Sequence, residues 1–152
     1  MATPDQFARE MSRLALSIEP RVASVMRRVA GQLLEDLVRG TPVDTGRARS
    51  NWQVSVGTAP RGVRRPYSPG ERLGISETSN ANAAIAAGRL AIQRFTDKTL
   101  DAPLVIGNTV FYVDSLRNGS SGQQPVDWVS IALARARTSL RLTNILERGA
   151  RR

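Results

Sequence analysis

The sequence contains neither cysteine nor histidine. Without cysteine there are no disulfides, thiolate zinc sites or cysteine nucleophiles, and without histidine there is no histidine-based catalytic triad. Lysine is almost absent as well, since Lys98 is the one lysine among 22 basic residues. These absences exclude the commonest kinds of catalytic and metal centre and leave arginine as the dominant charged residue.

Long apolar runs are also missing. A helix that spans a bilayer needs about 20 mainly apolar residues, and no stretch of the sequence approaches that length. The segment Met1–Phe7 lacks the basic region and the apolar run of a signal peptide. We therefore expect no membrane contact and a chain that folds in a cytoplasm-like compartment.

The overall composition is that of a globular protein. The chain has 152 residues, of which 41% are hydrophobic, a net charge of +9 and a mean hydropathy of −0.26. This length suits one hydrophobic core, so we expect a single domain over residues 1–152. Arginine makes bidentate contacts with carboxylates and phosphates, so the charge balance permits an acidic partner, nucleic acid included.

The N-terminal segment, residues 1–39, has the periodicity of an amphipathic helix. Thr3 and Gln6 form a capping box around Pro4, which suits the first helical position. Apolar residues then recur in steps of three and four as far as Leu37. Pro20 removes one backbone hydrogen bond, so we expect a kink or two abutting helices there.

Two further helices are expected. The second begins at Ser79–Asn80, and small and apolar residues share one face, which lets a partner approach closely: Ala81, Ile85, Gly88, Ile92 and Phe95. The third follows Pro125, with Asp127 in its first turn. It ends at Gly149, and residues 149–152 are expected to be a frayed basic tail.

Between the helices, alternating and β-branched segments predict strands. Arg47–Gly57 alternates, with Trp52 on its apolar parity, and follows a turn at Asp44–Gly46. Leu104–Gly107 and Val110–Val113 predict one bent strand or a tight hairpin. The order of elements predicts an α+β fold: a long N-terminal helix and a C-terminal helix packed on a small antiparallel β-sheet, with an additional middle helix.

The acidic residues give no catalytic pattern. Glu35 and Asp36 lie at the end of a helix beside Arg39, and we interpret them as solvated helix-end charges. Neither they nor Asp97 and Asp101 have the spacing that general acid–base catalysis by paired carboxylates requires. Nothing in the pattern suggests a metal site or a phosphate-binding glycine loop. We therefore assign no catalytic, cofactor-binding or metal-binding residue and expect a protein that is not an enzyme.

Arginine is concentrated in two places, which form the candidate basic contact surface. Residues 58–76, rich in proline and glycine, predict a long exposed loop, and the last helix carries a basic strip. The members of the surface are Arg61, Arg64, Arg65, Arg72, Arg137 and Arg141. No nucleic-acid recognition motif surrounds them, and Trp52 and Trp128 fall on apolar faces typical of a core. Non-specific phosphate contact stays open, but pairing with acidic patches on a protein neighbour is the favoured interpretation.

Two polar segments are not explained by local folding. The first, Pro42–Arg47, is a turn that enters a strand; the second, Asn118–Pro125, is a polar loop that follows Tyr112 and precedes the last helix. In this order the two segments resemble the tail-completion or neck proteins of long-tailed bacteriophages, which include the lambda-type minor tail protein Z. The resemblance covers residues 5–147.

The resemblance implies a structural virion protein that joins heads to tails. It implies a homo-oligomer, with a ring favoured and a hexamer the preferred order, and no cofactor. The implied partners are tail-tube, terminator and head-connector proteins, with possible contact to genomic DNA. The implied location is the neck or upper tail of the virion, and the host cytoplasm during assembly. The alternative is a basic accessory protein that binds duplex phosphates without sequence preference.

The two segments also supply candidate interface residues. They present polar edges to neighbouring subunits, and the arginines at the strand entry are available to pair with a neighbour's carboxylates. The candidate residues are Asp44, Thr45, Gly46, Arg47, Arg49, Tyr112, Asn118, Gly119, Ser120, Ser121 and Gln124.

Overall fold

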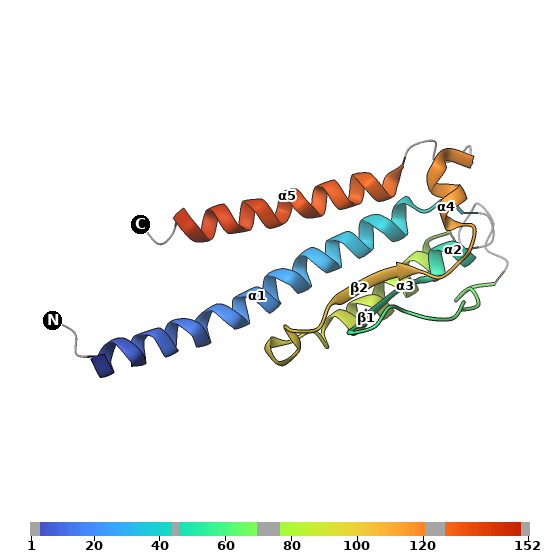
Figure 1. Ribbon diagram of the computed structural model, residues 1–152. Helices are drawn as coiled ribbons and strands as arrows, with labels where there is room; N and C mark the ends of the chain where they lie inside the picture. Colours follow the sequence, from blue (N-terminus) through green and yellow to red (C-terminus); the bar gives the residue numbers. More distant parts are fainter. Residues whose placement is uncertain (1–3, 44–45, 70–76, 121–126, 150–152) are drawn as a thin grey trace.

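The computed structural model of the chain describes residues 4–43, 46–69, 77–120 and 127–149 (Figure 1). The helices are α1 (Pro4–Gly40), α2 (Arg47–Ser50), α3 (Glu77–Ile92), α4 (Val113–Ser115) and α5 (Trp128–Gly149). The strands are β1 (Trp52–Val56) and β2 (Leu104–Asn108), and two single turns lie at Asp97–Thr99 (3₁₀) and Leu116–Ser120 (π).

Helix α1 is the central element. Figure 1 shows α5 running along one side of α1, whereas α3 and the sheet lie on the other side. The two strands pair antiparallel, from Trp52 opposite Asn108 to Val56 opposite Leu104, and α3 packs against β1. The expected α+β class, with two long terminal helices, a middle helix and a small antiparallel sheet, is therefore confirmed.

Helix α1 is continuous across Pro20. It is one helix of 37 residues, so of the two alternatives expected at Pro20, a kink or two abutting helices, the second is wrong. Proline removes one hydrogen bond from the helix ladder, and the bonds of the neighbouring turns carry the helix through. The C-terminal half of α1 is the part that reaches the core, through Leu34, Leu37 and Val38.

The core lies where α1, α3 and the sheet meet. Leu34 and Val38 of α1 and Ile92 of α3 are completely or almost completely buried. All five residues of the predicted small-residue face of α3 are buried, which confirms that face. Gly88 brings α3 close to α1, because a Cβ atom at this position would collide with Leu34 Cδ2 and lie 3.2 Å from Val54 Cγ2. Trp52 and Trp128 are buried too, as predicted.

The strand expected over Arg47–Gly57 begins five residues later than predicted. Arg47–Ser50 is a short helix instead, and the strand covers only Trp52–Val56. Gly46 has a left-handed backbone (φ 71°), and the Ser50 amide donates to the Gly46 carbonyl at 3.0 Å. This one helical turn places Ala48 and Ser50 in the interior. The two residues that shared the apolar parity of the predicted strand are therefore buried by a helical turn and not by a strand.

The second β segment also differs from the prediction. Val110–Val113 forms neither a continuation of the strand nor a hairpin. The Asn108 side chain accepts a hydrogen bond from the Val110 amide at 3.1 Å, and the Val113 amide donates to the Val110 carbonyl at 3.2 Å. The chain therefore turns away where β2 ends at Asn108, opposite the first residue of β1, and this turn leads into α4.

The polar loop expected over residues 118–125 is described in part. Its first residues belong to the π turn Leu116–Ser120, and the remainder lies outside the described residues. Helix α5 then begins at Trp128, and Asp127 precedes it as a cap instead of lying in its first turn. The Asp127 carboxylate accepts the Ser130 amide at 3.0 Å. Hydrogen bonds from Ser130, and then the pairing with Arg117, lower the pKa of Asp127.

The two acidic residues near the end of α1 connect helices and are not merely solvated. Glu35 Oε1 accepts from Arg39 Nε at 2.9 Å, and Glu35 Oε2 accepts from Arg89 Nη2 of α3 at 2.7 Å. The hydrogen bond from Arg39, followed by the two arginine charges, lowers the pKa of Glu35. Asp36 faces α5, with Oδ2 at 3.9 Å from Arg135 Nη1.

The close approach of α3 to α1 gives a direct test of the core. We expect Gly88→Ala to destabilise the protein by about 1–3 kcal/mol, because the added methyl group overlaps Leu34. The matched control is Gly31→Ala in α1, where a Cβ would meet nothing within 4 Å. That control should stabilise the protein by about 0.5–1 kcal/mol through helix propensity. Urea denaturation followed by circular dichroism measures both, and equal effects of the two substitutions would contradict the packing described here.

Candidate functional site

The turn between α1 and α2 holds the first candidate segment. Asp44 and Thr45 lie outside the described residues, whereas Gly46 is buried and Arg47 is exposed. Thr41, just before the turn, donates its hydroxyl to the Leu37 carbonyl at 2.7 Å and accepts the Trp52 indole N–H at 2.7 Å. The end of α1 and the start of β1 are thereby joined, and Arg47 is held at the surface on a fixed backbone.

Arg49 has a different role from the one expected. Only 8% of its surface is exposed. Its guanidinium donates to the Thr41 carbonyl, at 2.9 Å from Nη2 and 3.3 Å from Nε. A cation at a helix C-terminus satisfies carbonyls that lack helical partners and interacts favourably with the helix dipole. The prediction that Arg49 faces a neighbouring subunit is therefore wrong, because this side chain closes the end of α1.

Asn51 holds the arginine-rich loop against the rest of the protein. Its Oδ1 accepts the Arg64 amide at 2.6 Å, and its Nδ2 donates to the Arg64 carbonyl at 2.9 Å and to the Arg47 carbonyl at 2.7 Å. Asn51 is completely buried. Buried amides are stable only when they are hydrogen-bonded, so this side chain fixes the backbone of the loop at Arg64.

Asn80 makes a second, similar connection from α3. Its Oδ1 accepts from the Ser50 hydroxyl and from the Ser68 amide, both at 2.8 Å, and its Nδ2 donates to the Ser68 carbonyl at 3.0 Å. A third connection runs through Gln53, whose Nε2 donates to the Gly62 carbonyl and to the Thr109 hydroxyl, both at 3.0 Å. Together these bonds attach the loop at three points.

The predicted basic contact surface divides into two groups. Arg61, Arg64 and Arg65 are exposed on the attached loop, and Arg72 lies outside the described residues. Arg137 and Arg141 are exposed on α5, which Figure 1 shows on the other side of α1. The structure therefore does not bring the two groups together into one surface.

The second candidate segment lies at the same end of the molecule as the first. The Asn108 Nδ2 donates to the Ala48 carbonyl at 2.7 Å, so the end of β2 is tied to α2, which follows the first segment. Tyr112 is half-buried and Asn118 is exposed. Gly119 and Ser120 belong to the π turn, and Ser121 and Gln124 lie outside the described residues. Figure 1 shows α2 and α4 close together at this end.

An exposed aromatic ring at this end was not foreseen. Phe111 is 90% exposed, and its ring meets the Tyr112 ring edge-on, with centroids 5.3 Å apart and an angle of 87°. The sequence placed Phe111 in a predicted strand, so its exposure depends on the turn after Asn108. The buried polar residues Asn51 and Asn80 were also missed, although a pair of polar residues directly before the apolar Trp52 was a usable signal.

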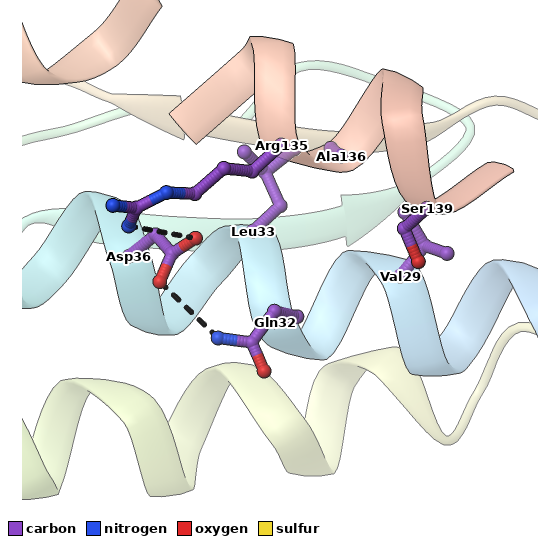
Figure 2. Close-up of a pocket in the computed structure, with 7 residues that line it drawn as sticks. All are labelled: Val29, Gln32, Leu33, Asp36, Arg135, Ala136 and Ser139. Carbon is purple, nitrogen blue, oxygen red and sulfur yellow. Dashed lines mark hydrogen bonds and ion pairs between the residues drawn. The ribbon is translucent and has the colours of Figure 1, made fainter. Parts of the chain in front are cut away.

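A shallow groove separates α1 from α5 (Figure 2). Val29, Leu33 and Ala136 form its apolar part. Asp36 lies between Gln32, whose Nε2 donates to Oδ1 at 3.1 Å, and Arg135. This carboxylate is already paired with a cation and an amide, so the groove offers helix-to-helix contacts and no free acid or base.

The described residues hold no group of three or more acidic side chains that is arranged to bind a metal ion. None of the described helices combines the length and the apolar character that crossing a bilayer requires. Several buried polar side chains fix the loop and the end of α1, and the exposed groups include arginines, carboxylates and single apolar residues. These features define an α+β subunit whose conspicuous surfaces are suited to contact with other macromolecules.

The chain belongs to the HK97-gp10-like family of bacteriophage tail components. The family, described as Bacteriophage HK97-gp10, tail-component, matches residues 5–113. The match includes the Pro42–Arg47 segment and Tyr112, whereas the Asn118–Pro125 segment lies beyond it, so the resemblance expected over residues 5–147 is shown for a shorter range. No curated protein and no solved structure matches the chain.

The attachment of the loop by Asn51 can be tested by substitution. We expect Asn51→Ala to destabilise the protein by about 1–3 kcal/mol, because it removes a buried side chain and leaves the amide and carbonyl of Arg64 without their partner. Trypsin should then cleave faster after Arg61 and Arg64, as followed by mass spectrometry. Asn118→Ala, at an exposed position, is the control and should leave cleavage in the loop unchanged. Unchanged cleavage in Asn51→Ala would contradict the attachment.

Proposed function

We propose that this phage tail component is a tail-completion or head–tail joining protein that acts as a homo-oligomeric ring, preferably a hexamer, at the neck. Its partners would be the tail-tube, terminator and head-connector proteins. The protein would be found in the virion, at the neck or upper tail, and in the host cytoplasm during assembly. Membership of a tail-component family supports the structural role, and a structural role requires no catalytic residue or cofactor.

The observation that supports an assembly surface is the grouping of interface candidates at one end of the molecule. The Asn108–Ala48 hydrogen bond connects the end of β2, four residues before Tyr112, to α2, which directly follows the turn of the Pro42–Arg47 segment. Several interface candidates are gathered there, with Arg47 and Asn118 exposed and Tyr112 half-buried. Such an end, built on a fixed backbone, can dock without first being ordered, which lowers the entropic cost of association.

The charge of this end favours acidic partners. Arg47 is exposed beside the turn, and a carboxylate on a neighbouring subunit can pair with it through a bidentate contact. Charge pairs of this kind contribute to the choice of partner and the rate of association more reliably than to affinity. The direction of the ring relative to head and tail would then follow from which partner supplies the carboxylates.

Virion assembly without this protein tests the proposed function. We expect particles that lack the chain to accumulate as DNA-filled heads and separate, complete tails, because the ring that joins them is missing. Negative-stain electron microscopy of induced cells measures the proportion of joined particles, and supplying the chain from a plasmid is the control. Infectious, joined virions in the absence of the protein would exclude this function.

A second candidate function is non-specific binding of duplex DNA. The observation that favours it is the row of exposed arginines, Arg61, Arg64 and Arg65, on a loop whose backbone is already held in place. Phosphate contacts require only such positioned cations and no base-reading motif. Contact with an acidic protein neighbour remains the preferred role of this loop, because no helical recognition element accompanies the arginines in the part of the loop that the structure describes.

Salt dependence distinguishes these two roles. If the loop contacts DNA, the isolated chain should bind a duplex at low salt, and the logarithm of the binding constant should fall with the logarithm of salt concentration by about 0.9 per phosphate contacted. Replacing Arg61, Arg64 and Arg65 together by alanine should then reduce this slope by about 3. Arg137→Ala with Arg141→Ala is the control for the other group. Absence of binding at low salt would exclude the DNA role.

A further inference from the structure

The exposed ring of Phe111 is accompanied in the sequence by an exposed carboxylate. Phe111 is 90% exposed on the turn that leaves β2, and Asp114, three residues further on in α4, is exposed as well. The edge-on contact with Tyr112 limits the orientations of the Phe111 ring. The end of the molecule therefore presents an apolar ring next to a carboxylate, both on a short turn bound to α2 through Asn108.

A groove whose charged residues are positive, and thus opposite in sign to Asp114, lies between β1 and α3. Val54, Ala87 and Ala91 line it, and Leu90 is 72% exposed at its rim. Two exposed arginines also line the groove, Arg64 from the attached loop and Arg94 just after α3. The groove thus combines an apolar patch with two positive charges, and its volume is about 280 Å³.

The size of the groove suits an aromatic ring. The volume of about 280 Å³ exceeds that of a closed apolar cavity of about 150 Å³ that binds benzene, so the groove has room for the ring of a phenylalanine. Arginine also interacts favourably with the face of an aromatic ring. The walls and the rim of the groove therefore match the two groups that the turn presents, a phenyl ring and a carboxylate.

We propose that Phe111 and Asp114 of one copy dock into this groove on the next copy. The Phe111 ring would lie against Leu90 and Ala91, and the Asp114 carboxylate would pair with Arg94. This inference rests on the proposed self-association and names its contact. Both Phe111 and Leu90 are exposed within one chain, so they are free to meet between chains. The two surfaces differ, which makes the contact head-to-tail, and such a contact forms a ring when its rotation closes.

The apolar half of the contact is tested by truncation. We expect Phe111→Ala and Leu90→Ala each to raise the dissociation constant for self-association at least about tenfold, as for central residues of an interface. Analytical ultracentrifugation over a range of concentrations measures it. Both residues are largely exposed, so thermal unfolding of the monomer should be unchanged. Leu142→Ala, 55% exposed on α5, is the matched control and should assemble like the unaltered chain.

The charged half is tested by reversal and rescue. Asp114→Arg and Arg94→Asp should each weaken self-association, because each places like charges together. The two reversals combined in one chain should restore it, since every copy then again offers an opposite charge to the next. Asp101→Arg, at another exposed acidic position, is the control and should change assembly little. Failure of the combined reversal to assemble better than either single variant would overturn the proposed pairing.

The outcomes separate this contact from the proposed function. If the unaltered chain assembles and Phe111→Ala, Leu90→Ala and Asp114→Arg assemble equally well, the contact is wrong and the ring is built through another surface. If Phe111→Ala self-associates normally but no longer binds the tail-tube or connector protein, Phe111 faces that partner and the contact is again wrong. If the unaltered chain remains monomeric, alone and mixed with those proteins, both the contact and the proposed ring are excluded.

Discussion

The close contact between α1 and α3 is the constraint on which the rest of the structure depends. A sheet of two short strands has too little apolar surface to be stable alone, and here each strand has five residues. Helix α3 packs against the sheet and, through Gly88, against Leu34 of α1. The same section of α1 binds α5 on its other side. Helix α1 therefore supports both halves of the molecule, and its buried C-terminal half is the common core.

The buried polar residues then decide what reaches the surface. The side chains of Asn51 and Asn80 hydrogen-bond to the backbone at Arg64 and Ser68. These bonds hold a segment without helix or strand in place at both residues. Arg61, Arg64 and Arg65 of that segment are exposed. Arg49 shows the reverse case, since its guanidinium is turned inward to the end of α1. Whether an arginine side chain is exposed or buried in this protein therefore depends on how the backbone around it is attached, and not on its position along the sequence.

A tail component works by contact, and the surfaces of this subunit are consistent with that. One end of the molecule gathers the turn before α2 and the turn after β2, and the groove between β1 and α3 lies on another part of the surface. Two different surfaces on one molecule permit head-to-tail contact, which gives a closed ring or an open filament according to its rotation. The sites proposed here differ from a catalytic site in that neither needs an ionisable group with a strongly shifted pKa.

The sequence by itself determined the helices, the α+β class and the core face of α3, because the periodicity of apolar residues is a local property that nearby residues fix. It also led to the phage tail family through the Pro42–Arg47 segment. Only the tertiary structure decided that Arg47–Ser50 is helical, that the chain leaves the sheet after Asn108, and that Arg49 is buried while Phe111 is exposed. Two of these features involve a partner far along the chain, Asn80 for Ser50 and Ala48 for Asn108. Hydrogen bonds between distant residues leave no periodic signal, so they become visible only when the chain is folded.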